Sequence, residues 1–275
     1  MIMAENLNFT SINIRGLGGK QKSKSVLNWL QSNSKGVTFL QETHSDENLA
    51  NKWRNYWKGS IYCAHGNTNS KGVAILFHPS MSHELLDKQD DKNGRYLIIR
   101  VKILEEIFVF ANCYLPTKNN EREQCAVLRE VIDVLNNFAN DTLIIGGDFN
   151  VTLNPFLEKS GGKIDANESK QFRLEMNALL LSFKVEDIIR NAFPDENLFT
   201  WHNKTKGISS RLDYWFISEN LLNRVTHCKI RSALYTDHDL VFFSLQSPMP
   251  IVHRGPGYWK FNASYISNPE YVEKN

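Results

Sequence analysis

Short apolar segments recur along this chain and are separated by polar turns. Residues 96–103 alternate, so that Leu97 and Ile99 lie on one face of a strand while Arg100 lies on the other. Residues 73–77 are apolar throughout, which is typical of a strand buried on both faces. The same criteria predict strands at residues 9–14, 37–41, 61–64, 73–77, 96–103, 107–114, 143–146, 198–202, 211–217, 226–232 and 240–245.

Helical periodicity appears between these strands. In residues 120–138, the side chains of Val127, Val131, Leu135 and Phe138 form an apolar stripe at three-to-four spacing, as on the buried face of a helix. This spacing predicts helices at residues 22–33, 46–56, 120–138, 169–183 and 185–189. Helices among many short strands favour an α/β fold, in which two mixed β-sheets pack face to face and are flanked by helices.

The composition changes near residue 247. Four of the eight prolines fall in residues 248–275, where hydrophobic periodicity is weak. We therefore expect one domain over residues 1–247 and a linker over residues 248–275 that leads toward a following domain. Within the linker, the aromatic stretch 258–261 is expected to dock on a neighbouring surface.

Bulk composition excludes several classes of protein. The chain is 41% hydrophobic and 23% charged, as ordinary globular proteins are. A net charge of +2 is too small to indicate a nucleic-acid partner and does not exclude one. None of the four cysteines forms a Cys-x-x-Cys pair, which argues against a zinc site and for reduced thiols. No apolar run approaches the ~20 residues of a membrane helix, so no membrane partner is expected.

The most informative segment ends the predicted strand at residues 143–146. The strand ends at Gly146 and Gly147 follows, and then Asp148 and Asn150 stand two positions apart, so both side chains face one side. The glycines allow another backbone or a phosphate to approach closely. A carboxylate beside an amide is what a phosphodiester hydrolase needs to orient a water and to bind charged oxygens. Taken alone, the segment is equally compatible with a simple turn.

Polar residues also stand at the ends of other predicted strands. They are Asn13, Glu42, Tyr114, Asp213, Asp237 and His238. Each has an ordinary alternative, such as a turn asparagine, a solvated carboxylate or a buried histidine. Ligands of layered α/β folds bind where strand ends converge, and together these residues supply every part of one mechanism.

That mechanism is metal-assisted phosphodiester hydrolysis. Glu42 is the expected oxygen ligand of a single Mg²⁺, and Mn²⁺ is the alternative metal. Asp148 is expected to position and activate the attacking water, although His238 is an open alternative as the proton acceptor. Asp213 is expected to orient His238 and favour its cation. Asp237 completes the metal or water network, and the remaining donors to phosphate oxygens are Asn150, Asn13 and Tyr114.

At this point the chain resembles a known family. The motifs are, in order, Asn13, Gln41-Glu42-Thr43, Tyr114, Gly147-Asp148-Phe149-Asn150, Arg211-Leu212-Asp213-Tyr214 and Thr236-Asp237-His238. They resemble the endonuclease/exonuclease/phosphatase superfamily. The local sequences 41–44, 71–76 and 254–262 are most similar to the apurinic-like endonuclease domain of LINE-type (non-LTR) retrotransposons. One position departs from the repair enzymes of the superfamily, because Arg15 stands where an acidic residue is usual.

The resemblance implies a fold, an activity and partners. It implies a four-layer α/β sandwich and Mg²⁺-dependent nicking of double-stranded target DNA, which leaves a 3′-hydroxyl primer for target-primed reverse transcription. It further implies a reverse transcriptase domain in the same longer polypeptide and action in the nucleus. We expect the isolated domain to be a monomer. A phosphatase or sphingomyelinase activity and a catalytically dead DNA-binding remnant are the alternatives.

A basic hairpin is the expected DNA contact beyond the catalytic residues. Residues 201–210 contain lysines and no acidic residue, as a loop that contacts phosphates does. In the resembling family this hairpin shapes target choice. The residues expected to contact DNA are Thr200, Lys204, Lys206, Arg211 and Thr236. Lys20, Lys22 and Lys24 form a second, weaker candidate patch.

Overall fold

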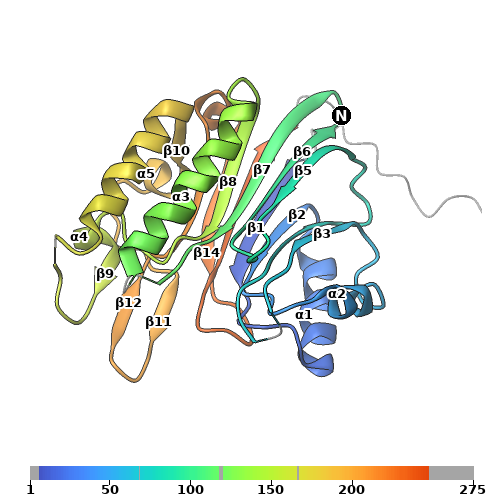
Figure 1. Ribbon diagram of the computed structural model, residues 1–275, viewed down its shortest axis with the longest axis horizontal. Helices are drawn as coiled ribbons and strands as arrows, with labels where there is room; N and C mark the ends of the chain where they lie inside the picture. The colour runs from blue at the N-terminus through green and yellow to red at the C-terminus, as the bar shows by residue number, and fades with distance from the viewer. Residues whose placement is uncertain (1–5, 68, 118–119, 166, 248–275) are drawn as a thin grey trace, which may run out of the picture.

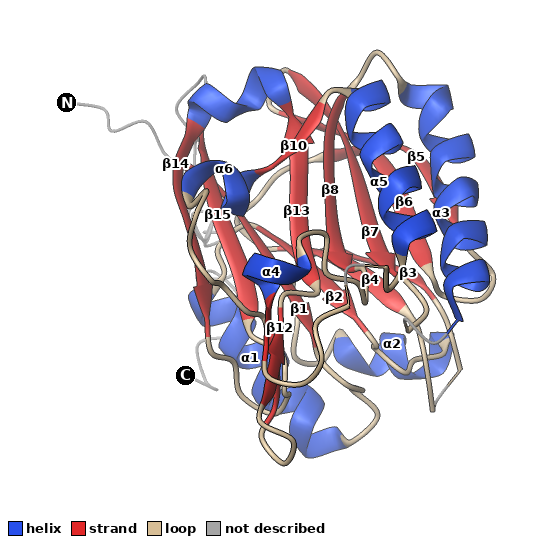
Figure 2. Cartoon of the chain, turned by 90° about the vertical axis from the view of Figure 1, so that its left-hand side faces the viewer, coloured by secondary structure: helices blue, strands red, loops and turns tan. Residues whose placement is uncertain are grey.

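A computed structural model describes residues 6–67, 69–117, 120–165 and 167–247 (Figure 1). Two six-stranded sheets lie face to face, and helices cover their outer faces (Figures 1 and 2). The predicted arrangement of two mixed sheets flanked by helices is therefore confirmed. The predicted linker at residues 248–275 lies outside the described residues.

The first sheet has the strand order β14-β15-β1-β2-β4-β3. Its strands are β1 (Asn6–Asn13), β2 (Val37–Gln41), β3 (Ile61–Ala64), β4 (Val73–Phe77), β14 (Val225–Arg231) and β15 (Leu240–Gln246). The pair β1–β2 is parallel, and the other pairs are antiparallel. Strands β2 and β4 are buried at every position, which explains their continuous apolar sequences.

The second sheet has the strand order β10-β13-β8-β7-β6-β5. Its strands are β5 (Glu84–Asp90), β6 (Tyr96–Ile103), β7 (Glu106–Tyr114), β8 (Thr142–Asp148), β10 (Val185–Asp187) and β13 (Asp213–Ser218). A third, small sheet contains β9 (Lys159–Ser160), β11 (Trp201–Asn203) and β12 (Ile208–Ser210). In Figure 1 the β11–β12 hairpin projects from one end of the sandwich.

The helices lie in two groups. The α helices are α1 (Lys20–Asn33), α2 (Glu47–Trp53), α3 (Glu121–Leu135), α4 (Pro155–Glu158), α5 (Lys170–Phe183) and α6 (Ile188–Ala192), and the 3₁₀ helices are η2 (Asn136–Phe138) and η3 (Glu219–Arg224). Helices α3 and α5 cover the second sheet, whereas α1 and α2 cover the first (Figure 1). No helix in the described part of the chain combines the length and apolar character that crossing a membrane requires.

Aromatic side chains fill the layer between the two sheets. Phe9 stacks on Phe243 with ring centroids 4.6 Å apart, and Trp215 lies 5.0 Å from Phe243. Phe39 and Phe110 extend the same cluster, and all five side chains are fully buried. Burial of each large ring contributes about 1.5–3 kcal/mol, so this layer holds the two sheets at a fixed separation.

Several elements of the structure differ from the prediction. Strand β5 was not predicted because the polar residues of this edge strand hide the periodicity, and most of its side chains are exposed. The predicted helix at 185–189 is wrong, since β10 occupies its first three residues and α6 begins at Ile188. Helix α4 and strand β9 were also missed, because segments of four and two residues carry no readable period.

Strand register brings the predicted site residues to one end of the sandwich. In the second sheet, Asp148 of β8 pairs with Tyr114 of parallel β7 and with Asp213 of antiparallel β13. In the first sheet, Asn13 pairs with Gln41, so that Glu42 follows at the same edge. Pairing aligns the site residues within each sheet, and packing of the two sheets brings the ends of these five strands together.

Candidate active site

Asp148 is the centre of the candidate site and is almost completely buried. Its Oδ1 accepts a hydrogen bond from the Asn150 backbone N–H at 2.9 Å, and its Oδ2 accepts one from Asn13 Nδ2 at 2.8 Å. The Asn150 side chain lies nearby, donating to the Leu115 carbonyl at 2.9 Å and to Asp148 Oδ2 at 3.3 Å. Two strand ends from different sheets therefore hold this carboxylate.

The preceding glycines are required by the protein itself. A Cβ at Gly146 would lie 2.4 Å from the Trp215 ring, and one at Gly147 would lie 2.0 Å from the Cys113 carbonyl oxygen. Gly147 also has a φ of +134°, which disfavours other residues. Of the two roles predicted for these glycines, the close approach of another backbone is the one that the structure shows.

Asn13 joins the two carboxylates of the site. Its Nδ2 donates to Glu42 Oε1 at 2.9 Å as well as to Asp148. Tyr114 forms a side-chain hydrogen bond with Glu42, and burial together with the charges of Glu42 and Asp148 raises the pKa of its hydroxyl. The phenol therefore remains protonated, and its single O–H donates to the Glu42 carboxylate.

His238 lies between two aspartates. Its Nδ1 is 2.9 Å from Asp213 Oδ2, and its Nε2 is 3.9 Å from Asp148 Oδ2. Burial alone would lower the pKa of His238, but the charge and hydrogen bond of Asp213, with further contributions from Asp148 and Asp237, raise it to about 9. The imidazole is accordingly a cation at neutral pH, with Nε2 directed toward Asp148.

The pKa of Asp148 is also raised, which for a carboxyl group favours the neutral form. Burial and the nearby charge of Asp213 raise the pKa of this carboxyl to about 7, although His238, Asn13 and Asn150 oppose the shift. A group that exchanges a proton near neutral pH is suited to general base catalysis. The 3.9 Å pair with His238 thus combines a proton acceptor with a fixed positive charge.

Four of the nine non-glycine residues with positive φ in the described part of the chain lie at the strand ends of the site. Positive φ angles occur at Arg15 (48°), Glu42 (50°), His44 (49°) and Asn150 (54°), none of which is glycine. Each such residue costs of the order of 1 kcal/mol or more, and strained residues cluster where a ligand is bound or a reaction occurs. All four lie within three residues of the ends of strands β1, β2 or β8, at the edge where the two sheets converge.

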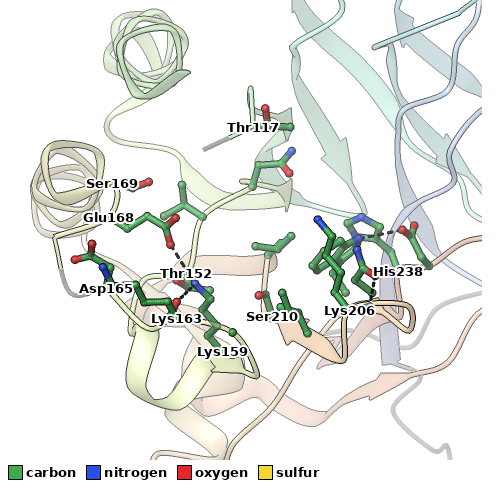
Figure 3. Close-up of a pocket in the computed structure, with 18 of the residues that line it drawn as sticks. Thr117, Thr152, Lys159, Lys163, Asp165, Glu168, Ser169, Lys206, Ser210 and His238 are labelled. Carbon is green, nitrogen blue, oxygen red and sulfur yellow. Dashed lines mark hydrogen bonds and ion pairs between the residues drawn. The ribbon is translucent and has the colours of Figure 1, made fainter. Parts of the chain in front are cut away.

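A pocket of 730 Å³ opens beside these residues. Figure 3 shows Lys159, Lys163 and Asp165 at one end and Lys206 with His238 at the other. Glu42 also lines the pocket. Charged groups of both signs line this pocket, and its volume accommodates a ligand larger than a single phosphate.

Asp237 lies at the mouth of the pocket and is already paired. Its Oδ2 accepts from Arg15 NH1 at 2.8 Å and from Trp201 Nε1 at 3.0 Å. Its Oδ1 is buried and has no hydrogen-bond partner within the described residues. The predicted role of Asp237 in a metal or water network therefore rests on one free oxygen, because the other is committed to two donors.

The residues predicted to contact DNA fall into two groups. Lys204 and Lys206 are exposed in the turn of the β11–β12 hairpin, and Lys206 lines the pocket. Thr200 is fully buried, and its hydroxyl accepts from the backbone N–H groups of residues 212 and 213 at 3.0 and 3.1 Å. Thr236 Oγ1 donates to the Asn13 carbonyl at 2.8 Å. Both threonines therefore position catalytic strand ends.

Arg211 requires a correction. Its side chain is 1% exposed and forms ion pairs with Glu158 and Asp187 beneath the hairpin, so it is not available to a DNA phosphate. A lone arginine in a basic loop sequence suggests an exposed contact, and its partners stand more than twenty residues away along the chain. Only the tertiary structure brings Glu158 and Asp187 to it.

The donors at this site fit a divalent metal. Glu42 and Asp148 are hard oxygen ligands on either side of Asn13, and Asp213 Oδ1 is buried with no partner in the described part of the chain. Ligand atoms of Asp148, Asp213 and His238 also lie within 4.8 Å of one another. Because His238 Nδ1 is engaged with Asp213, the carboxylates are the better candidates, and Glu42 faces the pocket.

Two residues of the site were not given a role from the sequence. Arg15 was noted only as a departure from related enzymes, and Trp201 was included only as part of a hairpin. The alternation of strand β1 was a usable signal for Arg15, since it stands two positions after Asn13. Trp201 offered no such signal, because its contact with Asp237 spans 36 residues.

Comparison with known proteins identifies the family. The sequence model of the Endonuclease/Exonuclease/phosphatase family matches residues 10–238. The chain is 31% identical over 273 residues to the transposon TX1 uncharacterized 149 kDa protein of Xenopus laevis, covering 97% of this chain and 20% of that protein. It is 26% identical over 263 residues to the DNA repair nuclease APEX1 of Danio rerio, covering 86% of this chain and 81% of that protein.

Solved structures share the fold. The AP endonuclease LMAP of Leishmania major superimposes with a TM-score of 0.75 at 18% identity, over 88% of each chain. An AP endonuclease of Archaeoglobus fulgidus superimposes with a TM-score of 0.67 at 19% identity, over 88% of this chain and all of the other. The matched residues 10–238 include every site residue described above. The chain therefore belongs to the endonuclease/exonuclease/phosphatase family, as its motifs indicated.

Proposed function

We propose that this domain is a metal-dependent DNA endonuclease that nicks target DNA for a retrotransposon. The observation that carries the proposal is the pairing of Asp148 with cationic His238 beside a 730 Å³ pocket. The named activities of the two AP endonucleases and of the DNA repair nuclease support a nuclease, and similarity to a transposon protein supports an element-encoded one.

The proposal gives a role to each residue at the scissile phosphate. Asp148 orients the attacking water and accepts its proton, because His238 already carries a proton at neutral pH and cannot accept another. The His238 cation and the amide of Asn150 stabilise charge on the phosphate oxygens. Asp213 holds the imidazole, so its effect on the reaction passes through His238.

Glu42 is the proposed holder of the metal, and Asp237 Oδ1, which is free of partners among the described residues, completes the metal or water network. When bound, Mg²⁺ or Mn²⁺ supplies positive charge that polarises the phosphate and stabilises the departing oxygen. Tyr114 and Asn13 keep the Glu42 carboxylate in place, since both form hydrogen bonds with it. The same proposal places the 3′-hydroxyl on the nicked strand, where a reverse transcriptase domain of a longer polypeptide extends it in the nucleus.

The domain is one part of such a polypeptide in this proposal. The chain spans a fifth of the length of the Xenopus transposon protein that it matches. We propose a single domain over residues 1–247 that acts as a monomer and a following linker that connects it to the reverse transcriptase.

Nicking of supercoiled plasmid tests the proposal. Wild-type protein with Mg²⁺ should produce the relaxed circle, whereas EDTA or the Asp148→Ala substitution should abolish it. A DNA polymerase should extend the nick without prior phosphatase treatment, which reports a 3′-hydroxyl. A folded wild-type protein that leaves the plasmid supercoiled with both Mg²⁺ and Mn²⁺ would refute the proposal.

A further inference from the structure

Arg15 presents a fixed positive charge at the mouth of the pocket. Its side chain is 56% exposed, lines the pocket and donates from NH1 to Asp237 Oδ2 at 2.8 Å. A guanidinium carries five N–H donors in a planar fork, and the Asp237 contact uses one nitrogen only. Among the described residues no other acceptor engages the guanidinium, so its remaining N–H groups are available to a ligand in the pocket.

The backbone of Arg15 is tied to the catalytic residues. Its N–H donates to Asn13 Oδ1 at 3.1 Å, and the next residue, Gly16, donates to the Glu42 carbonyl at 2.6 Å. These bonds hold Arg15 at a φ of 48°, a conformation that ordinary residues rarely adopt. A strained backbone that places one cation beside Glu42 indicates that the position of this charge matters.

Asp237 orients the guanidinium from the other side. Its Oδ2 accepts from both Arg15 and Trp201, and its backbone carbonyl accepts from the His202 N–H at 3.1 Å. Asp237 is thus held by strand β11 and in turn holds Arg15. An exposed ion pair contributes little to stability, about 0–1 kcal/mol, so stability alone does not explain this arrangement.

We propose that Arg15, oriented by Asp237, binds a phosphate of the DNA backbone in the pocket. The inference rests on the proposed function and adds a contact that secures the substrate before the chemical step. Carboxylates at this end of the pocket repel an anionic strand, and a planar guanidinium matches the oxygens of a phosphate. Asp237 is a positioning residue in this arrangement, because it acts through Arg15.

Salt dependence of DNA binding tests the contact. Binding of a fluorescent duplex is measured in EDTA between 50 and 300 mM salt, so that no cleavage occurs. Loss of one phosphate contact should reduce the slope of log K against log salt by about 0.9 in Arg15→Gln. Arg15→Lys should retain most of the slope, because it keeps the charge. Arg54→Gln, which removes an exposed arginine that does not line the pocket, should match the wild type.

Kinetics and a double substitution test the two roles. In single-turnover nicking, Arg15→Gln should raise the DNA concentration that gives the half-maximal rate. It should leave the rate at saturating DNA unchanged. Asp237→Asn should weaken binding when Arg15 is present and should not weaken it further in Arg15→Gln. Binding that weakens equally in both backgrounds would show that Asp237 has only a structural role.

The outcomes separate this inference from the proposed function. Wild-type protein that nicks DNA, with an unchanged salt slope in Arg15→Gln, would overturn the inference and leave the endonuclease intact. A large loss of the saturating rate with unchanged affinity would also overturn it, since Arg15 would then act in the transition state. Wild-type protein that neither binds nor nicks DNA would overturn both.

Discussion

Two buried clusters of charge lie on either side of Leu212 and differ in how completely their charges are satisfied. In the first, which we call the support cluster, the Arg211 guanidinium binds the carboxylates of Glu158 and Asp187. In the second, the catalytic cluster, His238 lies between Asp213 and Asp148. The same types of residue serve the fold in one cluster and the proposed reaction in the other.

The support cluster is nearly saturated. Burial would lower the pKa of Arg211, but Asp187, Tyr214 and Glu158 raise it, so the cation is stabilised. The Tyr214 hydroxyl donates to Glu158 Oε2 at 2.8 Å, and Arg190 lies 3.4 Å from Glu158 Oε1. Such a network fixes the start of β13 and hence the strand end that carries Asp213.

The catalytic cluster is left incomplete. Asp213 Oδ1 is buried with no partner among the described residues, and burial raises the pKa of Asp148. Unsatisfied buried charge reduces stability, and it is tolerated where a ligand or metal completes the site. A functional cluster therefore differs from a structural one in having buried charged groups without a full set of protein partners.

The largest expected effect concerns catalysis. His238→Gln should lower the single-turnover nicking rate by about 10³-fold, because glutamine preserves the shape but removes the cation. The far-ultraviolet circular dichroism spectrum should match that of the wild type. A rate within tenfold of the wild type would break the assignment of this cluster to catalysis.

The support cluster should instead control stability. Arg211→Met should lower the free energy of unfolding by about 3–5 kcal/mol, because two carboxylates lose their buried partner. Urea denaturation measures this loss, and Arg54→Gln provides the exposed control. A loss below ~1 kcal/mol would show that this cluster is not what holds the start of β13.

The pH dependence of stability should distinguish the clusters further. The pKa of His238 is raised to about 9 in the folded protein. Its contribution to the free energy of unfolding is therefore complete below its unfolded-state pKa, near 6.5, and is lost as the pH rises through 9. Between these values, stability of the metal-free protein should fall by about 1.4 kcal/mol per pH unit more steeply in wild type than in His238→Gln. Equal slopes in urea titrations at pH 6.5 and 8.5 would contradict this.

The smallest expected effect compares one substitution type in both clusters. Asp148→Asn should raise the free energy of unfolding of the metal-free protein at pH 8 by about 1 kcal/mol, because it removes an ionised carboxylate that burial disfavours. Glu158→Gln should lower it, because Arg211 loses a partner. Thermal unfolding in EDTA measures both changes. Stability changes of the same sign in the two variants would contradict the proposed difference between the catalytic and support clusters.

Much of the architecture follows from the sequence because burial imposes local periodicity. The predicted strands 37–41, 61–64, 73–77 and 96–103 agree with β2, β3, β4 and β6 residue for residue. Prediction failed where burial is one-sided or segments are short, as at exposed β5 and at the β10–α6 junction. An edge strand has few buried side chains, so its sequence carries little of the pattern.

The candidate site divides in the same way. Strand-end positions such as Asn13, Glu42 and Asp148 were predictable, because alternation and sheet pairing place strand ends at one edge. The burial or exposure of each charged side chain was not predictable. Whether an arginine is buried like Arg211 or exposed like Arg15 depends on partners that lie far away in the sequence.

The sequence by itself determined the layered α/β fold, the family and the residues that gather at one end of the sheets. Only the tertiary structure decided which carboxylates are neutralised, that burial raises the pKa of Asp148 and that Arg15 faces the pocket while Arg211 is buried. The physical reason is that residue type and periodicity are local properties, whereas burial and electrostatic potential sum over groups that folding brings together.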